Sequence, residues 1–219
     1  SMTFGWLTSE LILRVTGKSL GTYFREEVGD QHEIDFFIGL PESEDHRVAE
    51  LVPFDIVRNE NSEQQKIELT EAQKSQRNSA GTLDIHNTKA WRQAEIPSAN
   101  GQGNAGGLAK FYSLIVPEDN SKKLLKDDTV NQMTTMQIEG RDLVLAVQVR
   151  WGVGFILNKH KVIYGPVESA FGHSGYGGSC AFGDPENKIG ISYVMNRMLD
   201  NFNADGRSIE LINATYNCL

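Results

Sequence analysis

The chain has 219 residues, which is enough for one domain with a sizeable hydrophobic core. Its 29 Asp and Glu residues outnumber its 21 Lys and Arg residues, and the resulting formal charge of −8 opposes binding to nucleic acid or to anionic membranes. Neither kind of partner is expected.

The cysteines and histidines give no sign of a metal or cofactor site. Cys180 and Cys218 lack metal-ligand spacing and stand in different sequence settings, so we expect free thiols in a reducing compartment and a cytoplasmic location. No apolar run approaches the ~18 residues of a membrane span. The histidines likewise show no ligand spacing with cysteine or carboxylates, so no metal is expected. These are His32, His46, His86, His160 and His173.

The first part of the chain predicts helices. Apolar residues recur at helical spacing from Phe4 to Val15, Thr3 can cap that helix, and Gly17 is placed to end it. Ser19 can start a second helix, and residues 42–52 predict a third, short one.

Residues 59–87 are polar and predict a long exposed excursion without chemistry. A helix bearing Leu108, Phe111, Tyr112 and Ile115 then follows the glycine-rich loop that starts at Gly101. This loop lacks the lysine and hydroxyl of a nucleotide-binding loop and follows no strand, so the pattern does not favour phosphate binding.

The second part of the chain predicts strands. Residues 143–149 read as a buried apolar element, residues 151–155 and 162–164 as short strands, and residues 209–216 as a terminal helix. Because helices precede strands, we predict an α+β fold with an antiparallel sheet flanked by helices. Residues 1–138 would be its mainly helical portion, and residues 139–219 its antiparallel strands and terminal helix.

Residues 170–198 predict an antiparallel hairpin of two strands. The turn would be Asp184-Pro185-Glu186-Asn187, because proline presets φ and Asp and Asn hydrogen-bond their own backbone. Five glycines precede that turn, and glycine weakens a strand interior. Either close packing against another backbone or a ligand lying along the strand, beside His173 and Ser174, would explain them.

Gly172-His173-Ser174-Gly175 is similar to the G-x-S-x-G nucleophile elbow of α/β hydrolases, but the match fails. The fifth position is Tyr176, and an elbow is followed by a helix whereas this segment continues as a strand. That fold also places its catalytic histidine after the serine in sequence, and no histidine follows His173. Ser174 is therefore not expected to be an elbow nucleophile.

Several passages, in order along nearly the whole chain, resemble serine β-lactamase-like hydrolases, especially the class C β-lactamase-like esterases related to penicillin-binding proteins. The passages are TFGWL from Thr3, RVTGKS from Arg14, FFIGLPE from Phe36, EIPSANG from Glu95, WGVGF from Trp151, FGHSGYGGS from Phe171, DPE from Asp184 and YVMN from Tyr193. The resemblance implies the β-lactamase/transpeptidase-like fold and acyl-enzyme chemistry on a small ester or amide, without a cofactor.

Members of this family use a Ser-x-x-Lys nucleophile, a Tyr-x-Asn or Ser-x-Asn element, and a Lys-Thr-Gly-type strand. The resemblance makes His173-Ser174-Gly175 the third element, with His in place of Lys and Ser in place of Thr. The Ser174 hydroxyl would hydrogen-bond the substrate, and the Tyr176 backbone N–H would be one of two oxyanion-hole donors. A histidine merely packed beside Phe171 is the structural alternative.

The other two elements are missing. No serine begins a Ser-x-x-Lys, no tyrosine begins a Tyr-x-Asn, and no Ser-x-Asn stands in the expected context. The chain thus resembles the carboxy-terminal portion of such an enzyme, without its amino-terminal strands and nucleophile helix. We expect residues 1–219 to be catalytically silent and to need the missing segment, a partner chain or self-association to cover its open sheet edge. A non-catalytic binding or scaffolding protein is the alternative.

Overall fold

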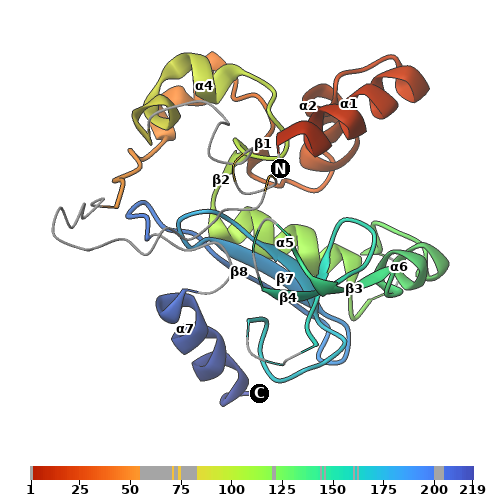
Figure 1. Ribbon diagram of the computed structural model, residues 1–219. Helices are drawn as coiled ribbons and strands as arrows, with labels where there is room; N and C mark the ends of the chain where they lie inside the picture. Colours follow the sequence, from red (N-terminus) through yellow and green to blue (C-terminus); the bar gives the residue numbers. More distant parts are fainter. Residues whose placement is uncertain are drawn as a thin grey trace, which may run out of the picture.

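The computed structural model describes residues 2–54, 71, 74, 83–119, 122–143, 145, 147–159, 161, 163–199 and 205–219. Figure 1 shows short helices from the first part of the chain gathered on one side of α5 (Ala105–Ile115), and a β-sheet on its other side. The terminal helix α7 (Gly206–Tyr216) lies beyond the sheet. Most of the predicted excursion over residues 59–87 lies outside the described residues.

Short elements build the amino-terminal part. The first helix, α1 (Met2–Thr16), is followed by Gly17 with a φ of 73°, a left-handed conformation that favours glycine. The hydroxyl of Ser19 accepts a hydrogen bond from the Thr22 N–H and caps α2 (Leu20–Phe24), as predicted. The other elements are η1 (Arg25–Gly29), β1 (Phe36–Phe37), η2 (Glu42–Arg47), η3 (Leu83–Asn87), α4 (Lys89–Gln93) and β2 (Gln102–Gly103).

Six antiparallel strands form the main sheet in the order β3-β4-β5-β6-β7-β8, so each strand pairs with its neighbours in the sequence. They are β3 (Ile138–Arg141), β4 (Gln148–Trp151), β5 (Ile156–Leu157), β6 (Phe171–Ser174), β7 (Cys180–Asp184) and β8 (Ile189–Tyr193). The helix α6 (Asp127–Thr134) precedes β3. The predicted α+β class with an antiparallel sheet and flanking helices is confirmed.

Both faces of the sheet bury apolar side chains, because alternate residues of a strand point to opposite faces. The α5 face holds Tyr112, Ile115, Val116, Phe171 and Ala181, and the α7 face holds Ile156, Tyr164, Ala170, Cys180, Phe182 and Ile212. A Cβ at Gly190 would lie 2.2 Å from the carbonyl oxygen of Ala109, so this glycine lets α5 rest directly on β8. The sheet is thus fixed from both sides where β6, β7 and β8 meet.

The predicted two-stranded hairpin over residues 170–198 is wrong, because the segment forms three strands. Residues 175–179 make a turn of their own between β6 and β7, with φ of 94° at Gly177 and 118° at Gly178. Gly175, Gly177 and Gly178 therefore belong to a turn, whereas Gly172 and Gly183 lie in β6 and β7. The predicted turn after Asp184 is confirmed, since its Oδ1 accepts hydrogen bonds from the backbone N–H groups of Glu186 and Asn187.

The buried element predicted over residues 143–149 and the short strands predicted over residues 151–155 and 162–164 are wrong where the structure describes them. Leu143 and Val147 are exposed rather than buried, and β4 begins only at residue 148. The predicted strand over residues 151–155 is a chain reversal, because Gly154 has a φ of 80°. Tyr164 lies in a turn and fills the core, while Val162 is outside the described residues. A short apolar run indicates that a segment is buried, but it does not distinguish a strand from a buried turn.

Buried tyrosines predict a loss of stability at alkaline pH. Burial raises the pKa of the Tyr112 and Tyr164 phenols above the ordinary value of about 10. Between the unfolded and folded pKa values the folded protein keeps protons that the unfolded chain releases. Stability is therefore full below pH 10 and falls above it, by about 1.4 kcal/mol per pH unit for each tyrosine.

Urea unfolding at pH 8, 10 and 11 measures this loss. In Tyr164→Phe the free energy of unfolding should fall less steeply with pH, by the contribution of one tyrosine. Because this variant keeps every lysine, the difference separates the tyrosine contribution from lysine titration. If the free energy of unfolding changed with pH equally in Tyr164→Phe and in the unchanged protein, Tyr164 would not contribute to the alkaline loss of stability.

Candidate active site

The end of β6 carries the four residues that the sequence singled out. His173 and Ser174 are its last two residues, and Gly175 and Tyr176 open the turn that follows. His173 and Tyr176 are exposed, whereas Ser174 and Gly175 are half-buried. The chain continues from these residues into β7 and not into a helix, so this is not a nucleophile elbow.

The imidazole of His173 is held at the surface by its own strand and by an indole ring. Its Nδ1 lies 2.7 Å from the carbonyl oxygen of Ser174, and because a carbonyl oxygen only accepts, Nδ1 carries the hydrogen. The Trp151 ring lies 5.7 Å away at a tilt of 41°. Trp151 pairs with Ile156 of β5, which in turn pairs with Gly172, the residue before His173. Phe171, by contrast, is fully buried.

The Ser174 hydroxyl hydrogen-bonds a buried tyrosine. Its Oγ lies 3.3 Å from the Tyr164 Oη, and Tyr164 is fully buried with its ring stacked on Phe182. Burial raises the pKa of the Tyr164 phenol, which therefore stays neutral at physiological pH. A neutral phenol does not remove a proton from serine, so this bond does not activate Ser174 as a nucleophile.

The turn over residues 175–179 is anchored at the amino terminus of α7. Asp205 caps that helix, and its carboxylate, which is fully buried, accepts hydrogen bonds from the Arg207 backbone N–H and guanidinium. A Cβ at Gly178 would lie 2.1 Å from the Asp205 Oδ2, so the turn backbone lies directly against this carboxylate. The Leu199 N–H donates to the Gly177 carbonyl oxygen at 3.0 Å and fixes the turn from another side.

The electrostatics of this anchor favour the ion pair. The Arg207 guanidinium holds the pKa of the Asp205 carboxyl below its usual range, chiefly through their hydrogen bonds. A second hydrogen bond joins the Arg207 Nη1 to the carbonyl oxygen of Arg197 at 3.0 Å, and the guanidinium lies 5.9 Å from the centre of the Tyr193 ring. The helix terminus, the turn and the end of β8 therefore form one connected unit.

The sequence contains a Ser-x-Asn triplet, Ser98-Ala99-Asn100, which folds its own loop. Asn100 is 1% exposed, and its side-chain amide donates to the carbonyl oxygens of Trp91 and Ala94, both at 2.6 Å. Its Oδ1 accepts from the Ile96 N–H at 2.9 Å. Because these bonds occupy the amide, the triplet serves loop structure and not proton transfer at β6.

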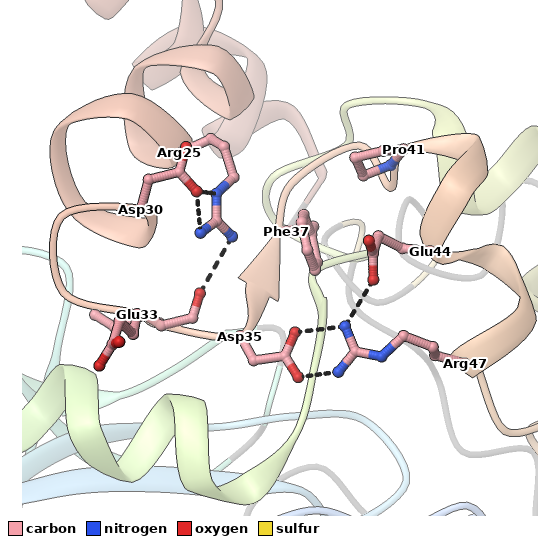
Figure 2. Close-up of a pocket in the computed structure, with 9 residues that line it drawn as sticks. Arg25, Asp30, Glu33, Asp35, Phe37, Pro41, Glu44 and Arg47 are labelled. Carbon is pink, nitrogen blue, oxygen red and sulfur yellow. Dashed lines mark hydrogen bonds and ion pairs between the residues drawn. The ribbon is translucent and has the colours of Figure 1, made fainter.

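A charged hollow of about 400 Å³ lies between η1, β1 and η2 (Figure 2). Its two guanidinium groups are already paired, Arg25 with Asp30 and Arg47 with Asp35 and Glu44. The hydrogen bonds of Arg47 to these carboxylates raise its pKa further above an already high value. With its cations neutralised, the hollow does not offer a binding site for an anionic substrate.

Within the described ranges, no group of three or more His, Cys, Asp and Glu side chains is arranged to hold a metal ion. None of the described helices combines the length and the apolar character needed to cross a bilayer.

The local sequence did not indicate the residues that surround the four. Trp151, Tyr164 and Asp205 lie between about 10 and 30 positions away along the chain, and the sheet and α7 bring them to the site. Asp205 alone carried a usable signal, because an Asp before the apolar positions of the terminal helix is a typical N-cap.

The comparisons with known proteins identify one family. The family model described as Beta-lactamase matches residues 1–214. The esterase/beta-lactamase LipL of Mycobacterium tuberculosis is 32% identical over 218 residues, covering 91% of this chain and 48% of LipL.

Solved structures agree in fold. A family VIII carboxylesterase superposes with a TM-score of 0.86 at 40% identity, covering 97% of this chain and 56% of the other. A penicillin-binding protein homologue from Caulobacter crescentus superposes with a TM-score of 0.83 at 35% identity, covering 100% and 57%. The chain thus spans about half the length of these relatives, and its fold is that of the β-lactamase/transpeptidase type.

Alanine at Gly178 should destabilise the site turn. The new Cβ would meet the Asp205 carboxylate, and the φ of 118° is one that alanine rarely adopts. We expect a loss of about 2–4 kcal/mol in the free energy of unfolding, measured by urea denaturation.

Alanine substitutions at two other glycines separate the cost of backbone strain from the cost of the steric clash at Gly178. Gly154→Ala has the strained φ of 80° without a clash and should cost about 1–2 kcal/mol. Gly140→Ala has neither problem and should be close to neutral. A Gly178→Ala loss no larger than that of Gly140→Ala would contradict the anchor.

Proposed function

Because the chain belongs to the β-lactamase family, we propose that it forms one wall of the acyl pocket in a serine hydrolase that cleaves esters or amides. The supporting observation is the end of β6, where His173 to Tyr176 enter a turn held by Asp205 and Arg207. The naming of LipL as an esterase/beta-lactamase and of a 40%-identical structure as a carboxylesterase favours the same chemistry.

Each of the four residues has a role in this proposal. The Tyr176 backbone N–H donates to the substrate carbonyl oxygen as negative charge develops on it, and Gly175 keeps the strand backbone accessible to the acyl group. The Ser174 hydroxyl, whose Oγ lies 3.3 Å from the Tyr164 phenol oxygen, would hydrogen-bond the substrate. His173 lines the same edge, in the position of the family's lysine.

The nucleophile comes, in this proposal, from polypeptide outside the 219 residues. The sequence holds no Ser-x-x-Lys, and the Ser174 bond to a neutral phenol provides no base. The attacking serine would add to the carbonyl carbon, and collapse of the tetrahedral intermediate would expel the alcohol or amine. Water would then release the acid and restore the serine.

Two surfaces are open to such polypeptide. The helix α1 exposes Phe4, Leu7 and Leu11 by 61–68% of their areas, more than a solvated helix face normally shows. The strand β8 has the uncharged sequence IGISY and, among the described strands, pairs only with β7. An uncharged edge strand is a template for a further strand, which the nucleophile-bearing segment, a partner chain or a second copy would supply.

A non-catalytic binding or scaffolding protein is the second candidate, favoured by the absence of Ser-x-x-Lys and Tyr-x-Asn from the sequence. The coding sequence adjoining Thr3 distinguishes the two. A Ser-x-x-Lys followed by a Tyr-x-Asn directly before it supports the enzyme, and their absence supports the binding protein.

Purified 1–219 should hydrolyse 4-nitrophenyl butyrate no faster than buffer, because no activated serine is present to form an acyl-enzyme. Absorbance of the released nitrophenolate measures the rate. Ser174→Ala is the matched control, and hydrolysis that disappears in Ser174→Ala would show that Ser174 is itself the nucleophile and refute the proposal.

Uncharged esters should be preferred over penicillin-like acids. The Nδ1–H of His173 already donates to the Ser174 carbonyl oxygen, so the ring has at most one nitrogen left for a substrate carboxylate, whereas a lysine ammonium group offers a full charge and three donors. The test uses a longer polypeptide that joins these residues to the family's Ser-x-x-Lys and Tyr-x-Asn.

In that polypeptide, His173→Lys should raise kcat/KM for benzylpenicillin relative to 4-nitrophenyl butyrate by about fivefold. A higher kcat/KM for benzylpenicillin than for the ester before substitution would count against the ester preference.

A further inference from the structure

An apolar surface borders the candidate site and has no role in the chemistry described so far. Tyr176 is 36% exposed, and its ring makes an edge-to-face contact with Phe54 at a centroid distance of 5.9 Å. Val52, two residues before Phe54, is 38% exposed. Val52, Phe54 and Tyr176 are called the apolar shelf below.

Backbone hydrogen bonds place Val52 beside residues 196–198. The Val52 N–H donates to the Asn196 carbonyl oxygen at 2.7 Å, and the Val52 carbonyl oxygen accepts from the Met198 N–H at 2.9 Å. These bonds make residue 52 an isolated bridge beside Arg197. Leu199, 39% exposed and bonded to Gly177 through its N–H, borders the shelf.

The segment that carries the shelf is fixed rather than loosely attached. The Asn87 side chain bonds the Leu51 backbone N–H and carbonyl oxygen, both at 2.8 Å. The bridge to residues 196–198 holds Val52, and the ring contact with Tyr176 holds Phe54. A partly exposed aromatic pair on a fixed backbone is a preformed contact surface, which costs a ligand little ordering entropy.

We infer that the apolar shelf binds the apolar group of an uncharged ester substrate, so that esters with chains of several carbons or an aromatic ring are preferred over acetates. The inference rests on the proposed function, which supplies the ester. Tyr176 joins the two surfaces, because its backbone belongs to the candidate oxyanion donor and its ring belongs to the shelf. The shelf carries no charged side chain, so it discriminates by apolar area and not by charge.

The size of the effect follows from buried area. Each buried methylene is worth about a fourfold gain in affinity. A six-carbon chain that buries about half of its extra methylenes should therefore bind roughly tenfold more tightly than a two-carbon one.

The test is an NMR titration of isotope-labelled 1–219 with 2-octanone, an uncharged carbonyl compound that no hydrolase can cleave, and with butanone as its short counterpart. We expect backbone amide shifts at Val52, Phe54, Tyr176 and Leu199, with butanone binding at least tenfold more weakly. Phe54→Ala should weaken 2-octanone binding about tenfold. Phe54→Leu, which keeps an apolar side chain, should weaken it less than threefold.

Leu211→Ala removes an apolar side chain that is 59% exposed on α7 and is the matched control, with no change expected. Shifts centred on α1 instead of residues 52–54, or a Phe54→Ala variant that binds like the unchanged protein, would overturn the inference. The titration needs no catalysis. Failure of ester hydrolysis in a longer polypeptide would therefore refute the proposed function and leave the shelf to be judged by the titration.

Discussion

The contact between the buried Asp205 carboxylate and the backbone of Gly178 fixes the geometry on which the candidate site depends. Asp205 caps α7 and binds the Arg207 guanidinium, so one carboxylate connects a helix terminus, a cation and a turn. A fully buried carboxylate is stable only when it is paired and hydrogen-bonded, which makes the arrangement all-or-none. Gly175 and Tyr176 take their positions from it, because their turn has no regular structure of its own, whereas His173 and Ser174 are held by the pairing of β6 with β7.

The site combines this rigid support with polar groups that are not set up to start a reaction. Tyr164 is neutral and buried beneath Ser174, and the His173 imidazole uses Nδ1 on a neighbouring carbonyl oxygen. Such groups can orient a carbonyl compound and stabilise charge, and the neutral phenol bonded to Ser174 cannot act as its base. Groups that orient a substrate without starting the reaction fit the proposal that this chain forms one side of a pocket. The chain spans about half the length of its relatives.

Local sequence chemistry predicted the parts of the fold that short-range interactions decide. The cap at Ser19, the end of α1 at Gly17 and the turn after Asp184 need only neighbouring residues, and all three are observed. The order of helices before strands also gave the fold class.

The sequence after Phe171 predicts one strand because a glycine-rich turn and a glycine-rich strand have the same composition, and only the positive φ values of Gly177 and Gly178 distinguish them. The four candidate site residues came from resemblance. Their neighbours could not be predicted, because the pairing of β4, β5 and β6 brings Trp151 to His173, and Tyr164 reaches Ser174 from a buried turn. The sequence can predict that an apolar segment is buried. The face of the sheet on which its side chains lie depends on the pairing of all the strands.

Covalent labelling of 1–219 with a fluorophosphonate, read by intact-protein mass spectrometry, tests the central claim most directly. A fluorophosphonate reacts with a serine that has been activated by a base and leaves an unactivated one unchanged. The account predicts that the chain keeps its unlabelled mass, since the Ser174 hydroxyl is bonded to a neutral phenol. A stoichiometric adduct on Ser174 would show that this residue is the nucleophile and would contradict the account.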